Sequence, residues 1–370
     1  MKLAFWLSAG LLVYTQAGYG VLLAALARLR GRAPAEPPRA AEPPTVSLIV
    51  PAYAEEAVIA DKVANARALE YPREQLEIVV ACDGSPDATP QRAREAGADV
   101  VLELPHGGKI RAQDAAVRRS RSDIVAFSDA NAIWERDALA RLVEPFADPA
   151  VGYVCGQVQF VNDAGTNQEG LYWRYEMWLR SLESGLASVT GGNGAIYATR
   201  REDYLVVDPV MGHDLSFPFN MVKRGRRAVY AQGARATEKM VPSIEGEFAR
   251  KRRMMSHAWP IVLRGGLLSP SGYPPLYALM IASHRALRYA SPFLHLVAFA
   301  ANAALLGEGW AYAAAFALQC ALLLAALVGG IRPFLVARYY VSTTASIACG
   351  LWDWARHGTP AGWAPAEGTR

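Results

Sequence analysis

The sequence predicts an α/β domain with a mostly parallel, doubly wound sheet, flanked at both ends of the chain by apolar helices. Strand-like and helix-like segments alternate from about residue 45 to residue 130, several strands end in polar residues, and apolar residues concentrate at the two ends. Alternating strands and helices form parallel sheets with helices on both faces. The 370-residue chain is 52% hydrophobic and 19% charged, so it is more apolar than an average soluble protein.

An apolar run over residues 3–29 opens the chain and exceeds the ~20 residues that span a bilayer. A cleavable signal peptide is the alternative, but its apolar core is usually only ~7–15 residues long. Arg28 and Arg30 close the run, so the positive-inside rule places the chain that follows in the cytoplasm. We therefore expect a transmembrane helix over residues 1–32, followed by a proline-rich linker over residues 33–44.

Short β-branched segments predict the strands of the central domain, and the segments between them have helical spacing. The expected strands are Val46–Val50, Leu76–Cys82, Val100–Leu104 and Ile124–Phe127, and the expected helices are Glu55–Leu69, Thr89–Ala96 and residues 109–120. The strand ends carry Pro51-Ala52-Tyr53, Asp83 and Ser128-Asp129-Ala130-Asn131. Because open α/β sheets bind ligands at the carboxyl ends of their strands, we expect these residues to line a ligand site.

Ser128-Asp129-Ala130-Asn131 carries the most specific chemistry among these strand ends. Carboxylate and amide oxygens are hard ligands that suit Mg²⁺ or Mn²⁺ bound to a diphosphate. An ordinary Asp/Asn turn after a strand is the alternative interpretation. The polar ends of the neighbouring strands favour the ligand site.

Beyond this sheet edge the sequence predicts a strand at Val151–Phe160, an amphipathic helix at Gly170–Ser188 and a glycine-rich turn that enters a strand at Thr190–Tyr197. Glycines in that turn allow the backbone to approach a ligand closely, although an ordinary loop would look the same. A run of cations over Arg250–Arg253 precedes the apolar C-terminal part. Such a run is usually a solvated helix face, but its position here favours a membrane surface or a phosphate as its partner.

The C-terminal part contains further apolar segments. Pro274–Ser283 is too short to span a bilayer and predicts an interfacial helix, whereas Tyr289–Leu306 and Trp310–Val328 predict a hairpin of two membrane spans. Pro333–Leu351 contains Arg338 and several hydroxyl groups, so it either spans the bilayer or lies at its interface. The expected division is residues 45–266 for the soluble domain, 267–284 for the interfacial region, 285–352 for the C-terminal transmembrane or interfacial helices and 353–370 for a polar tail.

The net charge and the cysteines argue against some classes of function. The net charge of +4 is modest and the basic residues cluster beside apolar segments, which fits an anionic membrane surface better than nucleic acid. Cys82, Cys155, Cys320 and Cys349 include no close-spaced pair. We therefore expect neither a disulfide framework nor a zinc site.

Six motifs occur in the order found in a known family. The segments VSLIVPAYAEE, ACDGSPD, GGKIRAQDAA, SDAN, GGNGAIYATRR and GHDLSFPFNMVKRGRRAVY resemble those of the membrane-bound family 2 glycosyltransferases, which include the cellulose, chitin and hyaluronan synthases. The resemblance covers about residues 45–253. It implies a GT-A fold, a nucleotide-sugar donor such as a UDP-sugar, and a multi-pass protein of the plasma (inner) membrane whose catalytic domain is cytoplasmic.

The resemblance also implies roles for the donor-side residues. The family's uracil and ribose contacts are matched by Pro51, Ala52, Tyr53 and Glu55. Asp83 matches the acid that meets the uracil base, and Lys109 matches the lysine near the donor phosphates. Asp129 and Asn131 match the D-x-D motif, with asparagine in its last position, and would bind a Mg²⁺ or Mn²⁺ ion that stabilises the leaving UDP.

On the acceptor side, Asp214 falls where the family has its general base. In an inverting transfer this base takes the proton of the acceptor hydroxyl. His213, where many relatives carry an acid, either orients the base or starts a helix. The turn that contains Gly192, Asn193 and Gly194 resembles the acceptor-side loop of the family.

The basic run departs from the family pattern. Processive members end the domain with Q-x-x-R-W, which binds the diphosphate and the growing chain. Here Arg250 and Arg253 supply cations for a diphosphate, but Met254 replaces the tryptophan, and Trp259 offers a platform for a sugar ring only at a different spacing. The departure weakens the case for long-chain synthesis.

Together these features predict an inverting membrane glycosyltransferase whose acceptor is a growing polysaccharide or a lipid. A ceramide or polyprenyl-phosphate glycosyltransferase would share most of the motifs. Two alternatives belong to other classes, namely an inactive nucleotide-sugar-binding subunit of an export complex and a transporter component. The scarcity of ionisable residues in the apolar segments argues against the transporter.

Overall fold

One eight-stranded sheet forms the centre of the computed structural model, which describes residues 1–31, 42–161, 170–239, 244–328, 330–360 and 362. The strand order is β3-β2-β1-β4-β7-β6-β8-β5. The strands are β1 (Val46–Ala52), β2 (Leu76–Asp83), β3 (Val100–Leu104), β4 (Ile124–Phe127), β5 (Ile133–Trp134), β6 (Val151–Val161), β7 (Tyr197–Arg200) and β8 (Arg227–Lys239). Most of the predicted proline-rich linker and part of the predicted polar tail lie outside the described residues.

The first half of the sheet is parallel, as the sequence predicts. Ile49 in the middle of β1 pairs with Val79 of β2 on one side and with Phe127 of β4 on the other. Every residue of β1 is buried, which is typical of a parallel strand covered on both faces. The helices that connect these strands are α3 (Ile59–Arg67), α4 (Thr89–Glu95) and α5 (Lys109–Arg119). The α/β fold class is therefore confirmed.

The second half of the sheet is mixed and was not fully predicted. β7 runs antiparallel to both β4 and β6, and β5 runs antiparallel to β8. The sequence analysis missed β5, β8 and the helix α6 (Ala138–Val143). β8 is hard to recognise because its sequence, RAVYAQGARATEK, contains exposed polar residues and pairs with β6 through shifts in register.

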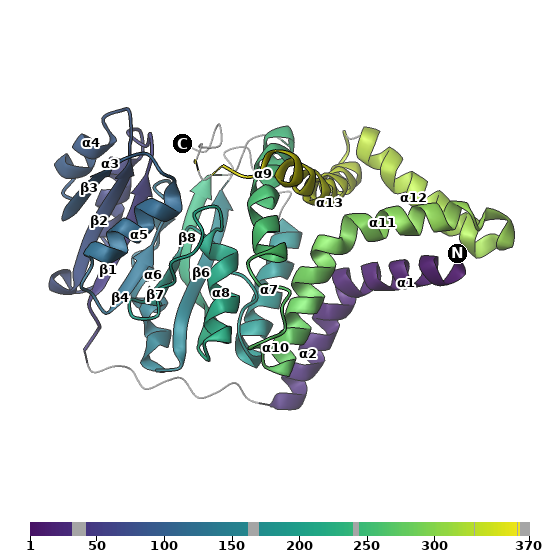
Figure 1. Cartoon of the computed structure of the whole chain (residues 1–370), viewed down its shortest axis with the longest axis horizontal. Helices are drawn as coiled ribbons and strands as arrows, with labels where there is room; N and C mark the ends of the chain where they lie inside the picture. The colour runs from purple at the N-terminus through teal and green to yellow at the C-terminus, as the bar shows by residue number, and fades with distance from the viewer. Residues whose placement is uncertain (32–41, 162–169, 240–243, 329, 361, 363–370) are drawn as a thin grey trace.

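Two helices pack on this mixed half, α7 (Gly170–Leu186) on β8 and α8 (His213–Lys223) on β6 and β8, and a third, α9 (Ile244–Leu263), packs on α8. The C-terminal helix α13 (Arg332–His357) packs along α9 (Figure 1). Arg252 of α9 forms an ion pair with Asp353 of α13 at 2.6 Å. By length and composition α13 is not among the candidate membrane spans in the described chain. Whether the third apolar stretch crosses a bilayer or lies at its interface stays a prediction.

Two helices in the described part of the chain are long and apolar enough to cross a membrane, Lys2–Arg30 and α12 (Trp310–Val328). The first consists of α1 (Lys2–Val13), a π-helical turn η1 (Tyr14–Gly18) and α2 (Tyr19–Arg30). In Figure 1, α1 and α12 project away from the sheet together with α11 (Leu287–Ala303), which packs along α1.

The predicted span over Tyr289–Leu306, and with it the predicted hairpin, stays a prediction. α11 ends at Ala303 after 17 residues and Leu306 begins a separate 3₁₀ turn. The helix continues from α10 (Pro275–Met280) through the π-helical turn η4 (Ile281–Ala286), and Arg288 in the first turn of α11 forms an ion pair with Glu176 of α7. Apolar composition alone does not reveal that the first turns of this helix are committed to protein contacts.

Trp259 of α9 is 6% exposed, packs edge to face on Tyr289 with ring centroids 5.3 Å apart, and donates its indole N–H to the Ile347 carbonyl at 2.8 Å. We expect Trp259→Ala to lower the free energy of unfolding by ~3–5 kcal/mol, because it removes a large buried ring. Thermal and denaturant unfolding of the purified chain would measure this loss. Trp352→Ala is the matched control, since Trp352 is 61% exposed, and its change should stay within ~0.5 kcal/mol. Equal effects of the two substitutions would contradict the core role of Trp259.

Candidate active site

The predicted donor-side residues lie at the carboxyl edge of the parallel half of the sheet. β1, β2 and β4 are neighbours in the order β2-β1-β4 and end at Ala52, Asp83 and Phe127. Because the three strands are parallel, Asp83 and the segment that begins at Ser128 leave the sheet on the same side. This is the edge at which open α/β sheets bind ligands.

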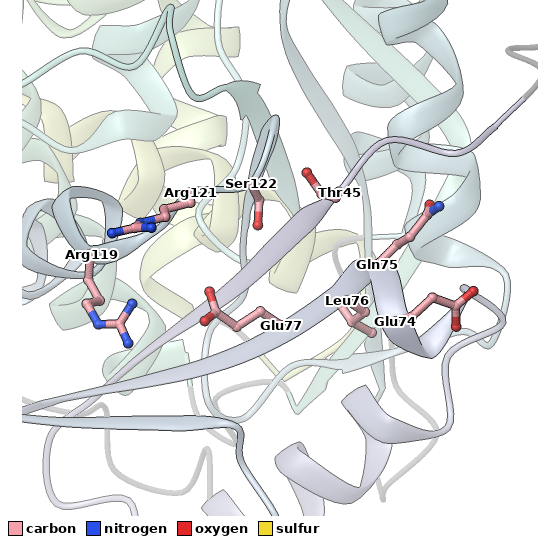
Figure 2. A pocket seen from close by; sticks show the side chains of 8 residues that line it. All are labelled: Thr45, Glu74, Gln75, Leu76, Glu77, Arg119, Arg121 and Ser122. Carbon is pink, nitrogen blue, oxygen red and sulfur yellow. The ribbon is translucent and has the colours of Figure 1, made fainter.

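A separate hollow lies at the opposite edge of the same sheet (Figure 2). It surrounds the amino ends of β1, β2 and β4. None of the predicted site residues lines it; its lining consists of Thr45, Glu74, Gln75, Leu76, Glu77, Arg119, Arg121 and Ser122. The chemistry of the strand ends is therefore not associated with this hollow.

Asp83 holds the loop that leads into helix α5. Its two carboxylate oxygens accept the backbone N–H groups of Gly107 at 2.7 Å and Gly108 at 2.9 Å, and its side chain is 2% exposed. Gly108 has a φ of 97°, a conformation that glycine adopts at little cost. The helix then begins at Lys109. In this conformation Asp83 therefore sets the position from which Lys109 projects.

Lys109 and Asp129 form an ion pair between the start of α5 and the end of β4. Their side chains are 23% and 22% exposed, so the pair remains accessible to a ligand. A Cβ atom added to Gly194 would lie 3.5 Å from Lys109 Nζ and 3.8 Å from Asp129 Oδ2. The glycine-rich turn therefore passes directly over the Lys109–Asp129 pair.

The same turn contacts the helix that carries Asp214. Gly192 donates its backbone N–H to the Asp214 carbonyl at 2.6 Å, and Asp214 lies in the first turn of α8. Asn193 stabilises the turn itself, because its amide donates to the Gly156 carbonyl at 2.7 Å and accepts from the backbone N–H of Ile196 at 2.8 Å. The turn thus connects the Lys109–Asp129 pair to the predicted base.

His213 starts helix α8 in a buried aromatic cluster. It is 3% exposed, and its Nδ1 lies 2.8 Å from the hydroxyl of Tyr197, whose ring stacks on Phe127 at 4.7 Å. Burial lowers the pKa of His213 to about 3, so the imidazole is neutral at physiological pH. The sequence left two roles open for His213, orienting the base or starting a helix. Its position at the beginning of α8 agrees with the second role. The cluster connects the end of β4 to the residue before Asp214.

Two ionisable residues near Asp129, the buried Lys62 and the half-buried Glu238, were not predicted from the sequence. Lys62 of α3 is fully buried and donates to the Ala132 carbonyl at 2.8 Å. Burial lowers its pKa to about 7, against the opposing charges of Asp129 and Glu238. Glu238 of β8 follows Thr237, which pairs with Ile133, and burial together with the charge of Asp129 raises its pKa to about 7. Lys62 could have been noticed in the sequence, because it is a lysine in the apolar stripe of a predicted helix. Glu238 gave no such signal, because it lies in a strand that was not predicted.

The other predicted donor-side residues surround the ends of β1 and β2. Pro51 and Ala52 are buried within β1, and Glu55 is buried as well, with 2% of its surface exposed. The rings of Tyr53 and His106 lie tilted against each other, with centroids 4.6 Å apart. Ala54, directly after Tyr53, has a φ of 53°, an uncommon backbone conformation for a residue with a side chain. The chain therefore turns sharply at this point.

The cations of α9 are divided among different partners. Arg250 forms an ion pair with Glu247 at 2.7 Å, Lys251 lies over the ring of Tyr339 at 3.9 Å, and Arg252 contacts α13. Arg253 is exposed. Trp259 is not with this group, because its side chain is buried between α9, α11 and α13.

The oxygen ligands of the site fit a divalent ion of the Mg²⁺ or Mn²⁺ type. Asp129 supplies a carboxylate and Asn131 an amide oxygen, which are hard ligands. Within the described ranges no group of three His, Cys, Asp or Glu side chains could hold a metal ion. A small protein ligand set is typical of Mg²⁺ sites that take their remaining ligands from substrate phosphates and water.

Comparison with known proteins agrees with this geometry. Residues 47–205 match the sequence profile of the family described as Glycosyl transferase family 2. The chain is 32% identical over 163 residues to a beta-monoglucosyldiacylglycerol synthase of Synechocystis sp., which is 41% of this chain and 33% of that protein. It is 30% identical over 122 residues to a poly-beta-1,6-N-acetyl-D-glucosamine synthase of Staphylococcus aureus, which is 32% of this chain and 29% of that protein. The matches thus span about a third of the length of these curated relatives.

A solved structure shares the fold over almost the whole chain. The mannosyltransferase PcManGT from Pyrobaculum calidifontis, solved in complex with GDP-Man and Mn²⁺, superposes with a TM-score of 0.74. The match covers 96% of this chain and 100% of that one at 24% sequence identity. This likeness confirms the predicted GT-A type of α/β fold.

Lys62 predicts a specific dependence of stability on pH. Its pKa is about 7 in the folded chain and ordinarily about 10.4 when the chain is unfolded. Between these values the unfolded chain binds more protons, so the contribution of Lys62 to stability should increase as the pH rises. Lys62→Met should flatten this increase in the thermal unfolding midpoint between about pH 7 and pH 9.5. Lys239→Met is the control, since Lys239 is exposed, and its unfolding midpoint should rise with pH as in the wild type. If the midpoint of Lys62→Met also rises as in the wild type, Lys62 does not have the lowered pKa.

Proposed function

The chain contains a glycosyl transferase family 2 domain over residues 47–205, and we propose that it transfers a sugar, with inversion, from a nucleotide-sugar donor to an acceptor at a membrane. One observation carries the proposal. The glycine turn lies over the Lys109–Asp129 pair at Gly194 and bonds to the Asp214 backbone at Gly192. A donor diphosphate at the pair would therefore be close to the backbone of Asp214, whose carboxylate we propose as the base.

The donor site in this proposal is the carboxyl edge of the sheet. Tyr53 and Asp83 lie on the side proposed for the base of the nucleotide, and Lys109 offers a cation to the diphosphate. A Mg²⁺ or Mn²⁺ ion held by Asp129 and Asn131 would offset the negative charge of the leaving nucleotide when bound. We propose a UDP-sugar on the strength of the motifs, and GDP-mannose is the alternative donor because PcManGT was solved with it.

The proposed chemistry on the acceptor side depends on Asp214. Its carboxylate would accept the proton of the acceptor hydroxyl while that oxygen attacks the anomeric carbon of the sugar. The bond between that carbon and the diphosphate breaks on the opposite face, and Lys109 is placed to stabilise the departing phosphate. His213 is too weak a base to take this proton, because burial lowers its pKa to about 3.

We propose a lipid as the acceptor and a growing polysaccharide as the second candidate. Lys2–Arg30 and α12 supply apolar helices that can reach a bilayer, with exposed residues such as Trp6, Leu318 and Leu327. Trp259 is buried and Met254 follows Arg253, so neither of these two positions offers the sugar platform of the processive members. The catalytic domain would then lie at the cytoplasmic face of the inner membrane. The diacylglycerol-based name of the Synechocystis relative is in line with a lipid.

Nucleotide release from UDP-sugars and GDP-mannose with Mn²⁺ or Mg²⁺ would test this function in the membrane-bound full chain. We expect Asp214→Asn to lower turnover by ~10²–10⁴-fold, the usual contribution of a general base, while the donor still binds. Asp129→Asn should instead weaken metal-dependent binding of the donor. Asp208→Asn is the matched control, since Asp208 is exposed in the loop before α8.

Two outcomes would contradict the proposal in different ways. Unchanged turnover in Asp214→Asn would remove Asp214 as the base. Donor binding without release of the nucleotide under any condition would favour the inactive subunit of an export complex. Mass spectrometry of lipid products from wild-type membranes would identify the acceptor.

A further inference from the structure

A buried polar cluster lies where the N-terminal helix meets α7 and the helix formed by η4 and α11. We call Tyr19, Glu183, Thr190, His284 and Arg285 the junction cluster. Tyr19 and Glu183 are each 1% exposed, Thr190 is fully buried and His284 is 5% exposed. These side chains come from four separate parts of the sequence, and none of them has a role in the proposed chemistry so far.

Hydrogen bonds connect the members of the junction cluster around one carboxylate. The hydroxyl of Tyr19 donates to Glu183 Oε1 at 2.6 Å, and Glu183 Oε2 accepts the backbone N–H of Thr190 at 3.0 Å. His284 Nδ1 lies 2.7 Å from Glu183 Oε1. Burial alone would raise the pKa of Glu183, but the charges of His284 and Arg285 and its hydrogen bonds hold that pKa below its ordinary value. Glu183 is therefore a buried, ionised carboxylate, and it depends on the groups that donate hydrogen bonds to it.

Thr190 joins this cluster to the glycine turn of the candidate active site. It directly precedes Gly191 and Gly192, and its hydroxyl accepts the Nε–H of Arg285 at 3.0 Å. The guanidinium of Arg285 lies against Gly191, where an added Cβ atom would overlap it. Gly192 then donates to the Asp214 carbonyl at 2.6 Å. A short series of contacts therefore runs from Tyr19 through Glu183 and Thr190 to the residue that bears the proposed base.

The two helices that supply the cluster are both distorted at this level. The π-helical turn η1 (Tyr14–Gly18) ends directly before Tyr19, and the π-helical turn η4 (Ile281–Ala286) contains His284 and Arg285. The turns touch, because the hydroxyls of Tyr14 and Ser283 are 2.8 Å apart. Single π-helical turns occur frequently at functional sites. This distortion is an observation independent of the hydrogen bonds, and it marks the same place.

We propose that Tyr19 is a positioning residue for the transfer reaction, acting through Glu183 and Thr190 on the turn that contacts Asp214. The inference rests on the proposed function. It makes the N-terminal helix a part of the catalytic scaffold as well as a membrane segment. Turnover then depends on the seating of that helix against α7, since Glu183 without its donor would no longer hold the Thr190 backbone in place.

Tyr19→Phe tests this inference, because it removes the hydroxyl and keeps the ring. In the full chain in membranes, with the donor that the wild type turns over, we expect kcat to fall by ~10–100-fold, since a small misplacement near the reacting groups costs this much. The donor KM should stay within about two-fold of wild type, as should binding of UDP or GDP with Mn²⁺, because the Thr190 end of the turn lies at Asp214, whereas Gly194 at the other end lies over the Lys109–Asp129 pair. A defect in folding alone would lower the amount of active protein and the binding capacity together.

Tyr14→Phe is the matched control, since Tyr14 bonds the same pair of helices at Ser283 but does not contact Glu183. Its kcat should equal that of the wild type. Thr190→Val and Thr190→Ser form a second test within the turn: the valine variant should lose kcat, and the serine variant, which retains the hydroxyl, should keep more of it. If Tyr19→Phe is poorly folded, the comparison of kcat between Thr190→Val and Thr190→Ser tests the inference instead.

The outcomes separate this inference from the proposed function. Wild-type turnover with an equal kcat in Tyr19→Phe overturns the inference and leaves the proposed function standing. Equal losses in Tyr14→Phe and Tyr19→Phe also overturn it, because they would indicate general helix packing. A wild-type chain that binds nucleotide but turns over no donor would remove the proposed function and this inference together.

Discussion

The close approach of the Gly191–Gly194 turn to its surroundings is the constraint on which the rest of the site depends. A Cβ atom at Gly192 would overlap the hydroxyl of Tyr153, one at Gly191 would overlap Arg285, and one at Gly194 would contact Lys109 and Asp129. The lack of side chains therefore lets one short segment lie between the donor-side pair and the start of α8. A side chain at Gly192 would require Tyr153 to move, whereas a Cβ atom at Gly194 would make only ordinary van der Waals contact with the pair.

Buried charge is the second feature that the structure must accommodate. Asp83 has its oxygens satisfied by the backbone of Gly107 and Gly108, Lys62 donates to a carbonyl beside Asp129, and Glu183 receives donors from three elements. A buried carboxylate or ammonium is tolerated only when it has such partners, because an unpaired buried charge costs several kcal/mol. These groups consequently fix loops and helix ends, and they do so next to the residues proposed for chemistry.

The parallel half of the sheet and the order of its motifs could be predicted from the sequence. β1, β2, β3 and β4 lie close to the expected ranges, because short β-branched runs between polar turns are strong local signals. Local signals failed for β8, whose polar residues hide its alternation, and they did not show that the first turn of α11 packs against α7. The contacts of Lys62, Glu238 and Tyr19 were not predicted either, since Lys62 bonds to Ala132 and Tyr19 to Glu183, both far away in the sequence, and Glu238 lies in an unpredicted strand.

The sequence by itself determined the chemistry that is available: the acids at the strand ends, the lysine at the start of α5, the glycines of the turn and the apolar segments at both ends. It determined these because ligand type, backbone freedom and hydropathy are properties of individual residues and short runs. Only the tertiary structure decided which of them meet. It placed Trp259 in the core, laid α13 along α9, and connected Tyr19 to the turn at Asp214, since contacts between distant segments depend on how whole elements pack and not on any local pattern.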